Sequence, residues 1–233
     1  MLNYQLTNFT FQTNFNGIPL TNHIEWQTIN YAMQRFNLQD RIQIWKIIRK
    51  WTPTQVSPGN YPSKEKDRLC PTCNKYQETP EHLLHCISTV QDNLRQKLKT
   101  QMSMLHIKHN LNPHLFQMCW LGMTTLENPM DHTIDLYPPI FHSIFRSQSQ
   151  LGWKQLYYGQ LSKEWMHFIG HNHPEIDATK FYAKLIQLVW EYVLEVWTTQ
   201  NQDNNAATEQ FPLNMLSKIN GIYASCDHLP PQT

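Results

Sequence analysis

Residues 70–86 read CPTCNKYQETPEHLLHC, and this stretch decides what kind of fold the chain can have. Cys70 and Cys73 are separated by two residues; eight residues later comes His82, and Cys86 follows four positions after it. A tight Cys-x-x-Cys turn offers two sulfur ligands, and a helix places residues i and i+4 on one face, one turn apart. The spacing therefore predicts one Zn²⁺ ion held by Cys70, Cys73, His82 and Cys86.

His85 is a second candidate for the fourth ligand, because it lies three residues after His82 on nearly the same side of a helix. We prefer His82, since it shares a helix face with Cys86, whereas His85 is adjacent to Cys86 in the chain. Four protein ligands leave no coordination position open, so the metal would be structural. So short a segment cannot bury enough apolar area alone, and metal binding would supply folding free energy on the order of 10 kcal/mol. The alternative that needs no metal is a cluster of buried free thiols.

The regions on both sides of this stretch have helical patterns. Ile44, Ile47, Ile48 and Trp51 have the spacing of one buried helical stripe, and Pro53 must end that helix at residue 51 or 52. The proline-rich residues 52–69 have no period. Further helices are expected from Thr79, as an N-cap, to about residue 102 or beyond, in short pieces over 110–140, and over 144–169 and 179–200.

These elements predict a mainly α fold: a helical domain with a small inserted satellite that consists of a Cys-x-x-Cys turn plus a helix. With only seven glycines in 233 residues, a glycine-rich phosphate-binding fold and a turn-dense β-sandwich are excluded. We expect a loosely ordered arm over 1–36, a basic helix, proline-rich loop and zinc module over 37–105, a helical tail domain over 106–200, and a polar linker and tail over 201–233.

No signal peptide or membrane span is apparent in the sequence, which predicts an intracellular, reducing compartment, either nucleus or cytoplasm. The charge is divided unevenly along the chain. Residues 41–110 hold twelve Lys or Arg against five Asp or Glu, a balance of +7, so the rest of the chain carries −6. Such a basic region favours a polyanionic partner, RNA or DNA, although a solvated surface would explain the charges equally well. The candidate nucleic-acid-binding residues are Arg41, Lys46, Arg49, Lys50, Lys64, Lys66, Arg68, Lys75, Arg95, Lys97 and Lys99.

Several short motifs together resemble one known family. Trp51-Thr52-Pro53-Thr54, then Cys-Pro-x-Cys, Glu78-Thr79 and His82-Leu83-Leu84, are similar to the zinc-binding region C-terminal to the polymerase of non-LTR retrotransposon reverse transcriptases. Downstream, Gly152-Trp153 and Gly159-x-x-Ser162-x-x-Trp165 resemble the helical tail that follows in some of these elements. The likeness covers about residues 36–200, but Gln200-Asn201 stands where such tails often have Arg-Asn.

The resemblance implies association with nucleic acid, and a polymerase in cis or in trans as a partner. No Tyr-x-Asp-Asp motif is present to bind the metal ions of a polymerase, and no complete nuclease motif occurs, so we expect no enzyme and no small-molecule substrate. His106, His109, His167, His171 and His173 are expected at solvated helix ends and turns. The alternative function is that of a zinc-containing helical protein-interaction or structural relic without nucleic-acid binding.

Overall fold

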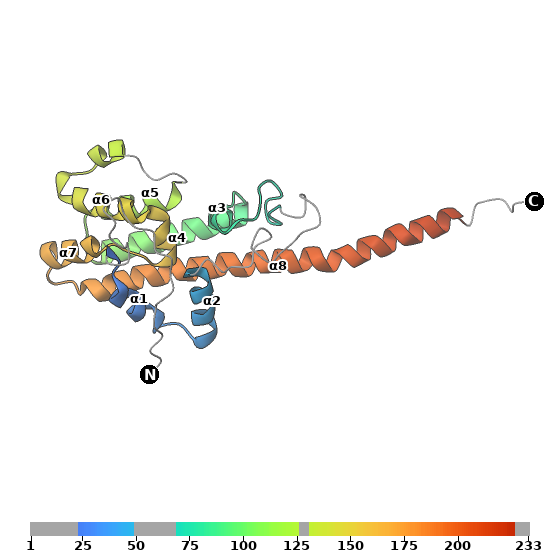
Figure 1. Ribbon diagram of the computed structural model, residues 1–233, viewed down its shortest axis with the longest axis horizontal. Helices are drawn as coiled ribbons and strands as arrows, with labels where there is room; N and C mark the ends of the chain where they lie inside the picture. Colours follow the sequence, from blue (N-terminus) through green and yellow to red (C-terminus); the bar gives the residue numbers. More distant parts are fainter. Residues whose placement is uncertain (1–22, 49–68, 126–130, 227–233) are drawn as a thin grey trace, which may run out of the picture. The chain divides into compact units, whose positions relative to one another are not determined.

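The computed structural model describes residues 23–48, 69–125 and 131–226, and for residues 80, 131–133 and 204–226 it describes the backbone only. These residues are mainly helical and include no β-strand, as predicted (Figure 1). The helices are α1 (Trp26–Met33), α2 (Leu38–Ile48), α3 (Pro80–His85), α4 (Thr89–Lys108), α5 (Pro113–Thr124), α6 (His142–Leu151), α7 (Lys163–Asn172) and α8 (Ala178–Cys226), with short 3₁₀ helices η3 (Asp131–Leu136), η4 (Pro139–Phe141) and η5 (Trp153–Tyr158).

The chain divides into two compact units, each made of two stretches that are distant in sequence. The first unit takes in residues 1–51 and 92–194, and the second takes in 52–91 and 195–233. Helix α4 therefore begins in the second unit and continues in the first, whereas α8 begins in the first and continues in the second. The sequence predicts consecutive segments with boundaries at residues 36, 105 and 200, and it does not predict units made of two distant stretches.

Large aromatic side chains fill the core of the first unit. Trp153, Trp165 and Trp190 are all fully buried. The rings of Trp153 and Trp165 meet edge to face with centroids 6.4 Å apart, and Trp165 meets Tyr182 of α8 in the same way at 5.9 Å. Such pairs are each worth about 0.5–1.5 kcal/mol beyond the area they bury. This core holds η5, α7 and the first part of α8 together.

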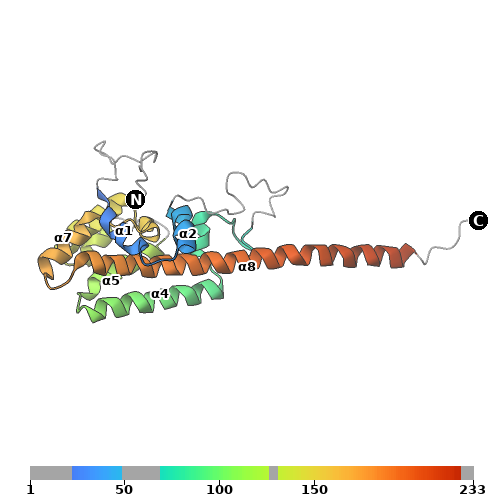
Figure 2. The same cartoon turned by 90° about the horizontal axis from the view of Figure 1, so that it is seen from below.

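Within the first unit, α4 runs antiparallel to α8. His106 of α4 contacts Phe181 with ring centroids 5.4 Å apart, while Arg95, eleven residues earlier, interacts with Tyr192, eleven residues later. Figures 1 and 2 both show the two helices side by side there. One face of α8 is buried and apolar, and the polar residue Gln187 is also buried and donates to Ala32 O.

The single helix predicted over residues 144–169 is observed as three separate helical elements. Residues 144–169 are split among α6, η5 and α7, because Gly152 (φ 92°) and Gly159 (φ 74°) adopt backbone conformations that end helices. A Cβ on Gly159 would lie 2.5 Å from the Trp190 ring, so only glycine permits this approach. The buried side chain of Gln148 bridges the segments: its Oε1 accepts from Ser162 N at 3.0 Å and Trp165 Nε1 at 3.1 Å.

The N-terminal arm predicted for residues 1–36 is wrong over α1. The Glu25 side chain accepts from Gln27 N and caps this helix, and Ile29 and Ala32 are buried in the first unit. Residues 1–22 lie outside the described residues. In α2 the predicted burial of Ile44, Ile47 and Ile48 is confirmed, while the predicted end of that helix at residue 51 or 52 lies outside the described part of the chain.

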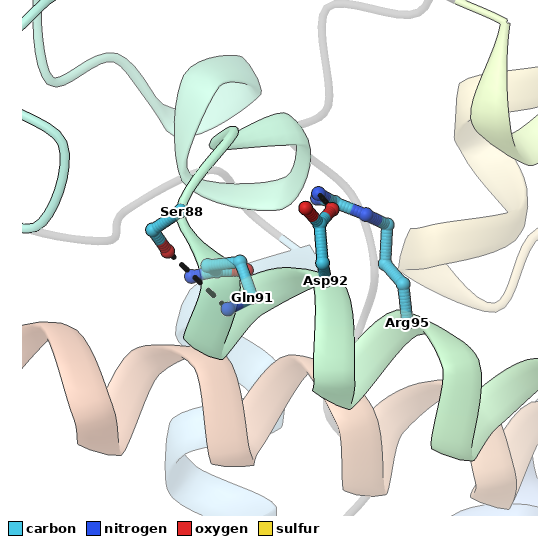
Figure 3. Close-up of polar contacts among 4 residues, drawn as sticks. All are labelled: Ser88, Gln91, Asp92 and Arg95. Carbon is cyan, nitrogen blue, oxygen red and sulfur yellow. Dashed lines mark hydrogen bonds and ion pairs between the residues drawn. The ribbon is translucent and has the colours of Figure 1, made fainter.

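Two further helix ends differ from the prediction. The helix that starts after Thr79 stops at His85, and α4 starts anew at Thr89, where the Ser88 hydroxyl accepts from Gln91 N (Figure 3). The polar linker and tail predicted for 201–233 instead continue α8 to Cys226. The amide-rich stretch of residues 201–211 contains neither glycine nor proline, and Ala206, Ala207 and Glu209 are strong helix formers, so the helix continues through it.

Candidate metal centre

The Cys-x-x-Cys segment forms a tight hairpin in the second unit. An antiparallel bridge pairs Leu69 with Gln77, and Cys70 N donates to Tyr76 O at 2.7 Å. Asn74 closes the turn with a left-handed backbone (φ 52°) and donates from its N–H to Cys70 O at 2.8 Å. Asparagine tolerates this conformation better than most residues. The hairpin therefore turns both thiols to the same side.

Helix α3 supplies the other two candidate ligands. Thr79 is its N-cap, as predicted, and the Thr79 hydroxyl accepts from His82 N at 3.0 Å. Pro80 occupies the first helical position, where its missing N–H costs nothing. Cys86 is the C-cap residue, and its extended backbone (ψ 136°) ends the helix. His82 and Cys86 are thus placed one helical turn apart by a helix with defined ends.

The four predicted ligand residues come together. Cys70 Sγ, Cys73 Sγ, Cys86 Sγ and a ring nitrogen of His82 all lie within 4.8 Å of one another, and this group can hold a metal ion. The Cys70 and Cys86 sulfurs are 3.9 Å apart, and Cys73 Sγ is 3.4 Å from His82 Nε2. His85 does not join the group, and its Nδ1 lies 3.0 Å from Glu81 O within α3. Among the described residues, no other group of three Cys, His, Asp or Glu side chains has such geometry.

The Cys70 and Cys86 thiols differ in acidity because their sulfurs share a hydrogen bond. This contact lowers the pKa of Cys70, against the opposing effect of burial, and raises the pKa of Cys86. The thiolate is the form that binds metal ions.

Buried polar side chains that sequence reasoning missed surround the cluster. Gln200 of α8 is fully buried, and its Nε2 lies 3.6 Å from Cys70 Sγ and 2.7 Å from Glu78 Oε1. The Thr72 hydroxyl lies 2.9 Å from Gln200 Oε1 and 2.6 Å from Asp203 Oδ2. One feature of the sequence indicates Gln200: it lies four residues after buried Val196, so a polar residue falls on an apolar stripe.

The predicted nucleic-acid-binding residues have different surroundings. Arg41 donates to Phe36 O and Gln34 O and so ties α2 to the preceding turn. Arg95 pairs with Asp92 one turn earlier (Figure 3). The Lys99 ammonium lies 5.6 Å from the centroid of the Trp120 ring. The exposed residues are Lys46, Lys75 and Lys97, whereas Arg49, Lys50, Lys64, Lys66 and Arg68 lie outside the described residues.

No protein-family model, curated protein or solved structure matches this chain. Among the helices that the structure describes, none combines the length and the apolar character needed to cross a membrane. The interpretation of the centre therefore depends on its own geometry and chemistry.

Proposed function

We propose that this chain is a non-enzymatic nucleic-acid-binding module stabilised by one structural Zn²⁺ ion, related to the regions that follow retrotransposon reverse transcriptases. The observation that carries the proposal is the convergence of three sulfurs and one imidazole nitrogen within 4.8 Å. Three thiolates and an imidazole are donors that Zn²⁺ prefers over Mg²⁺ or Ca²⁺.

The distances between donor atoms fit a tetrahedral zinc site. With Zn–S near 2.3 Å and Zn–N near 2.0 Å, tetrahedral geometry requires sulfurs about 3.8 Å apart and a sulfur–nitrogen distance of about 3.5 Å. The Cys70–Cys86 sulfur separation of 3.9 Å and the Cys73–His82 separation of 3.4 Å are close to these values. A disulfide would need sulfurs at about 2.05 Å, so these thiols fit a metal better than a cross-link.

Four protein ligands would saturate the ion, and this supports a structural role over a catalytic one. A hydrolytic zinc keeps one coordination position for water or substrate, whereas four protein ligands would occupy every position of a tetrahedral ion. The ion would then hold the hairpin of residues 69–77 against α3. A zinc-held hairpin is a rigid base from which exposed side chains can contact a partner.

Two side chains on the returning arm of that hairpin are suited to nucleic acid. Lys75 is exposed, and its neighbour Tyr76 is 54% exposed with its ring 5.6 Å from that of His82. A cation beside an accessible aromatic ring can pair with phosphate and stack on an unpaired base. Arg68 directly precedes the hairpin in the sequence, and the +7 balance of residues 41–110 adds to the attraction for a polyanion. A polymerase, in cis or in trans, would be the natural companion of such a module.

The zinc part of the proposal is tested by elemental analysis. We expect one zinc per chain in the wild-type protein and none in Cys73→Ser, because three remaining ligands leave the ion incompletely held. Cys119→Ala is the matched control, since Cys119 is a buried thiol of the first unit and should not affect zinc content. A folded wild-type protein that carries no zinc would disprove the proposal.

The nucleic-acid part is tested by fluorescence anisotropy with single-stranded RNA, single-stranded DNA and duplex DNA over a series of salt concentrations. We expect affinity to fall steeply with salt, and Lys75→Glu to weaken binding several-fold and lower the salt slope by about one. Lys163→Glu makes the same change of charge at an exposed position of α7 and should have much less effect. Equal effects of the two variants would mean that the hairpin makes no specific contribution.

A second function is favoured by a separate observation. Met104 and Ile107 of α4 are 64% and 73% exposed, and Arg41 and Arg95 form hydrogen bonds within the fold instead of remaining available for phosphate. These features fit a helical protein-interaction module that keeps zinc without binding nucleic acid. Zinc-loaded, folded protein that binds neither RNA nor DNA would select this second function.

A further inference from the structure

The side chain of Gln200 links helix α8 to the metal centre, although the two are 130 residues apart in the chain. Gln200 is fully buried and belongs to the second unit, as do all residues that it contacts there. Its carboxamide lies among Cys70, Glu78 and Thr72. Buried amide groups in folded proteins have hydrogen-bond partners, and these three neighbours supply them for Gln200.

The neighbours determine which way the amide points. A carboxylate only accepts hydrogen bonds, so the Glu78 Oε1 atom at 2.7 Å must face the Gln200 amide nitrogen. The oxygen then faces the Thr72 hydroxyl at 2.9 Å. Glu78 takes one of the two amide hydrogens, and Cys70 Sγ, 3.6 Å from the same nitrogen, is placed to accept the other.

A donor aimed at a ligand sulfur acts on the metal. An N–H···S bond stabilises the thiolate and fixes its direction, and losing such an outer partner typically costs 10–100-fold in metal affinity. This inference rests on the proposed zinc site. We propose that Gln200 is a positioning residue that holds the Cys70 thiolate for zinc. We also propose that the order of α8 around residue 200 depends on the metal as a result.

The second half of this proposal follows from thermodynamic reciprocity. If the Gln200 contact tightens zinc binding by a given factor, zinc must stabilise the contact by the same factor. The single hydroxyl hydrogen of Thr72 can go to Gln200 Oε1 at 2.9 Å or to Asp203 Oδ2 at 2.6 Å, and either bond ties the hairpin to α8. Metal binding at the hairpin should therefore stabilise the backbone hydrogen bonds of α8 near these residues.

The test compares Gln200→Leu and Gln200→Met with Gln202→Leu, an exposed position two residues along the same helix. Zinc affinity is measured by competition with a chelator. Both Gln200 variants should bind one zinc 10–100-fold more weakly than the wild-type protein, and Gln202→Leu should stay within twofold. Gln200→Met keeps about the length of the side chain, removes the N–H donors and adds no charge beside Glu78, so it separates loss of the donor from loss of packing.

Two further readouts distinguish positioning from a merely structural role. With Co²⁺ in the site, loss of an N–H···S bond makes the thiolate a stronger electron donor, so the sulfur-to-cobalt charge-transfer band should move to longer wavelength in the Gln200 variants while the tetrahedral ligand-field bands remain. Hydrogen exchange of residues 196–203 should accelerate on zinc removal in the wild-type protein, and this dependence on zinc should shrink in the Gln200 variants.

The outcomes are distinct from those of the proposed function. Wild-type protein without zinc would remove both the proposed function and this inference. Wild-type protein with zinc, together with Gln200 variants that match Gln202→Leu in affinity and charge-transfer energy, would overturn the inference alone. The inference does not depend on whether the module binds nucleic acid.

Discussion

A single buried imidazole should make the stability of the first unit depend on pH. His106 is 3% exposed, contrary to the solvated helix end expected for it, and its ring meets the rings of Phe116 and Phe181 edge to face. Burial lowers the pKa of His106, and repulsion from His109 adds to this, while a hydrogen bond with Met102 O opposes it. The folded state therefore favours the neutral ring.

The sign of the effect follows from linkage. The unfolded chain takes up the proton near pH 6.5, whereas the folded chain resists it until a lower pH. The contribution of His106 is thus complete above about pH 6.5 and is lost as the pH falls toward the lower folded pKa. Within that window the free energy of unfolding should drop by up to about 1.4 kcal/mol per pH unit.

His106→Asn tests this prediction, because an asparagine amide can replace the Nδ1 donor and does not titrate. Its free energy of unfolding should be lower than that of the wild-type protein at pH 7.5, owing to the lost ring, but should change less between pH 6.5 and 5. Urea unfolding followed by near-ultraviolet circular dichroism gives both values. His167→Asn, at an exposed position, should keep the wild-type slope. Parallel pH profiles for the wild-type protein and His106→Asn would contradict the assignment.

The start of helix α3 could be predicted from the sequence, but its end could not. Thr79-Pro80-Glu81 identifies the start of α3 because a cap, a proline and an acid each favour that position locally. Its end at Cys86 has no local cause, since the following Ile87-Ser88-Thr89 contains neither glycine nor proline. The break instead accompanies the return of the Cys86 thiol toward Cys70, a tertiary contact that periodicity does not contain.

The metal centre also has a part that could be predicted from local sequence and a part that could not. The four ligands could be identified because they lie within 17 residues, and their spacing indicates which side chains share one face of a helix or turn. Gln200 could not, because no local pattern relates it to Cys70. Glu78 is similarly 1% exposed for reasons visible only in the fold, where the Gln200 amide donates to it. Outer partners of a metal site are thus much harder to find from a single sequence than the ligands.

At the scale of the whole molecule, the two units obtain their stability from different sources. The first unit buries a continuous aromatic core that includes Trp153, Trp165 and Trp190. The second unit has a short hairpin, a helix of six residues and part of α8, so much of its stability is expected to come from zinc, on the order of 10 kcal/mol in comparable sites. Removing the metal should therefore affect the units unequally.

We predict that a chelator unfolds the hairpin and α3 while the first unit stays folded. Hydrogen exchange should become fast over residues 69–91, whereas the near-ultraviolet circular dichroism of the buried tryptophans of the first unit should persist. Its thermal midpoint should move by no more than about 2 °C, which corresponds to about 0.5–1 kcal/mol in a unit of this size. Cys73→Ser should reproduce the chelated state, and further chelator should not change it. Collapse of the tryptophan signal on chelation would instead mean that α4 and α8, which pass from one unit into the other, make the two units unfold as one.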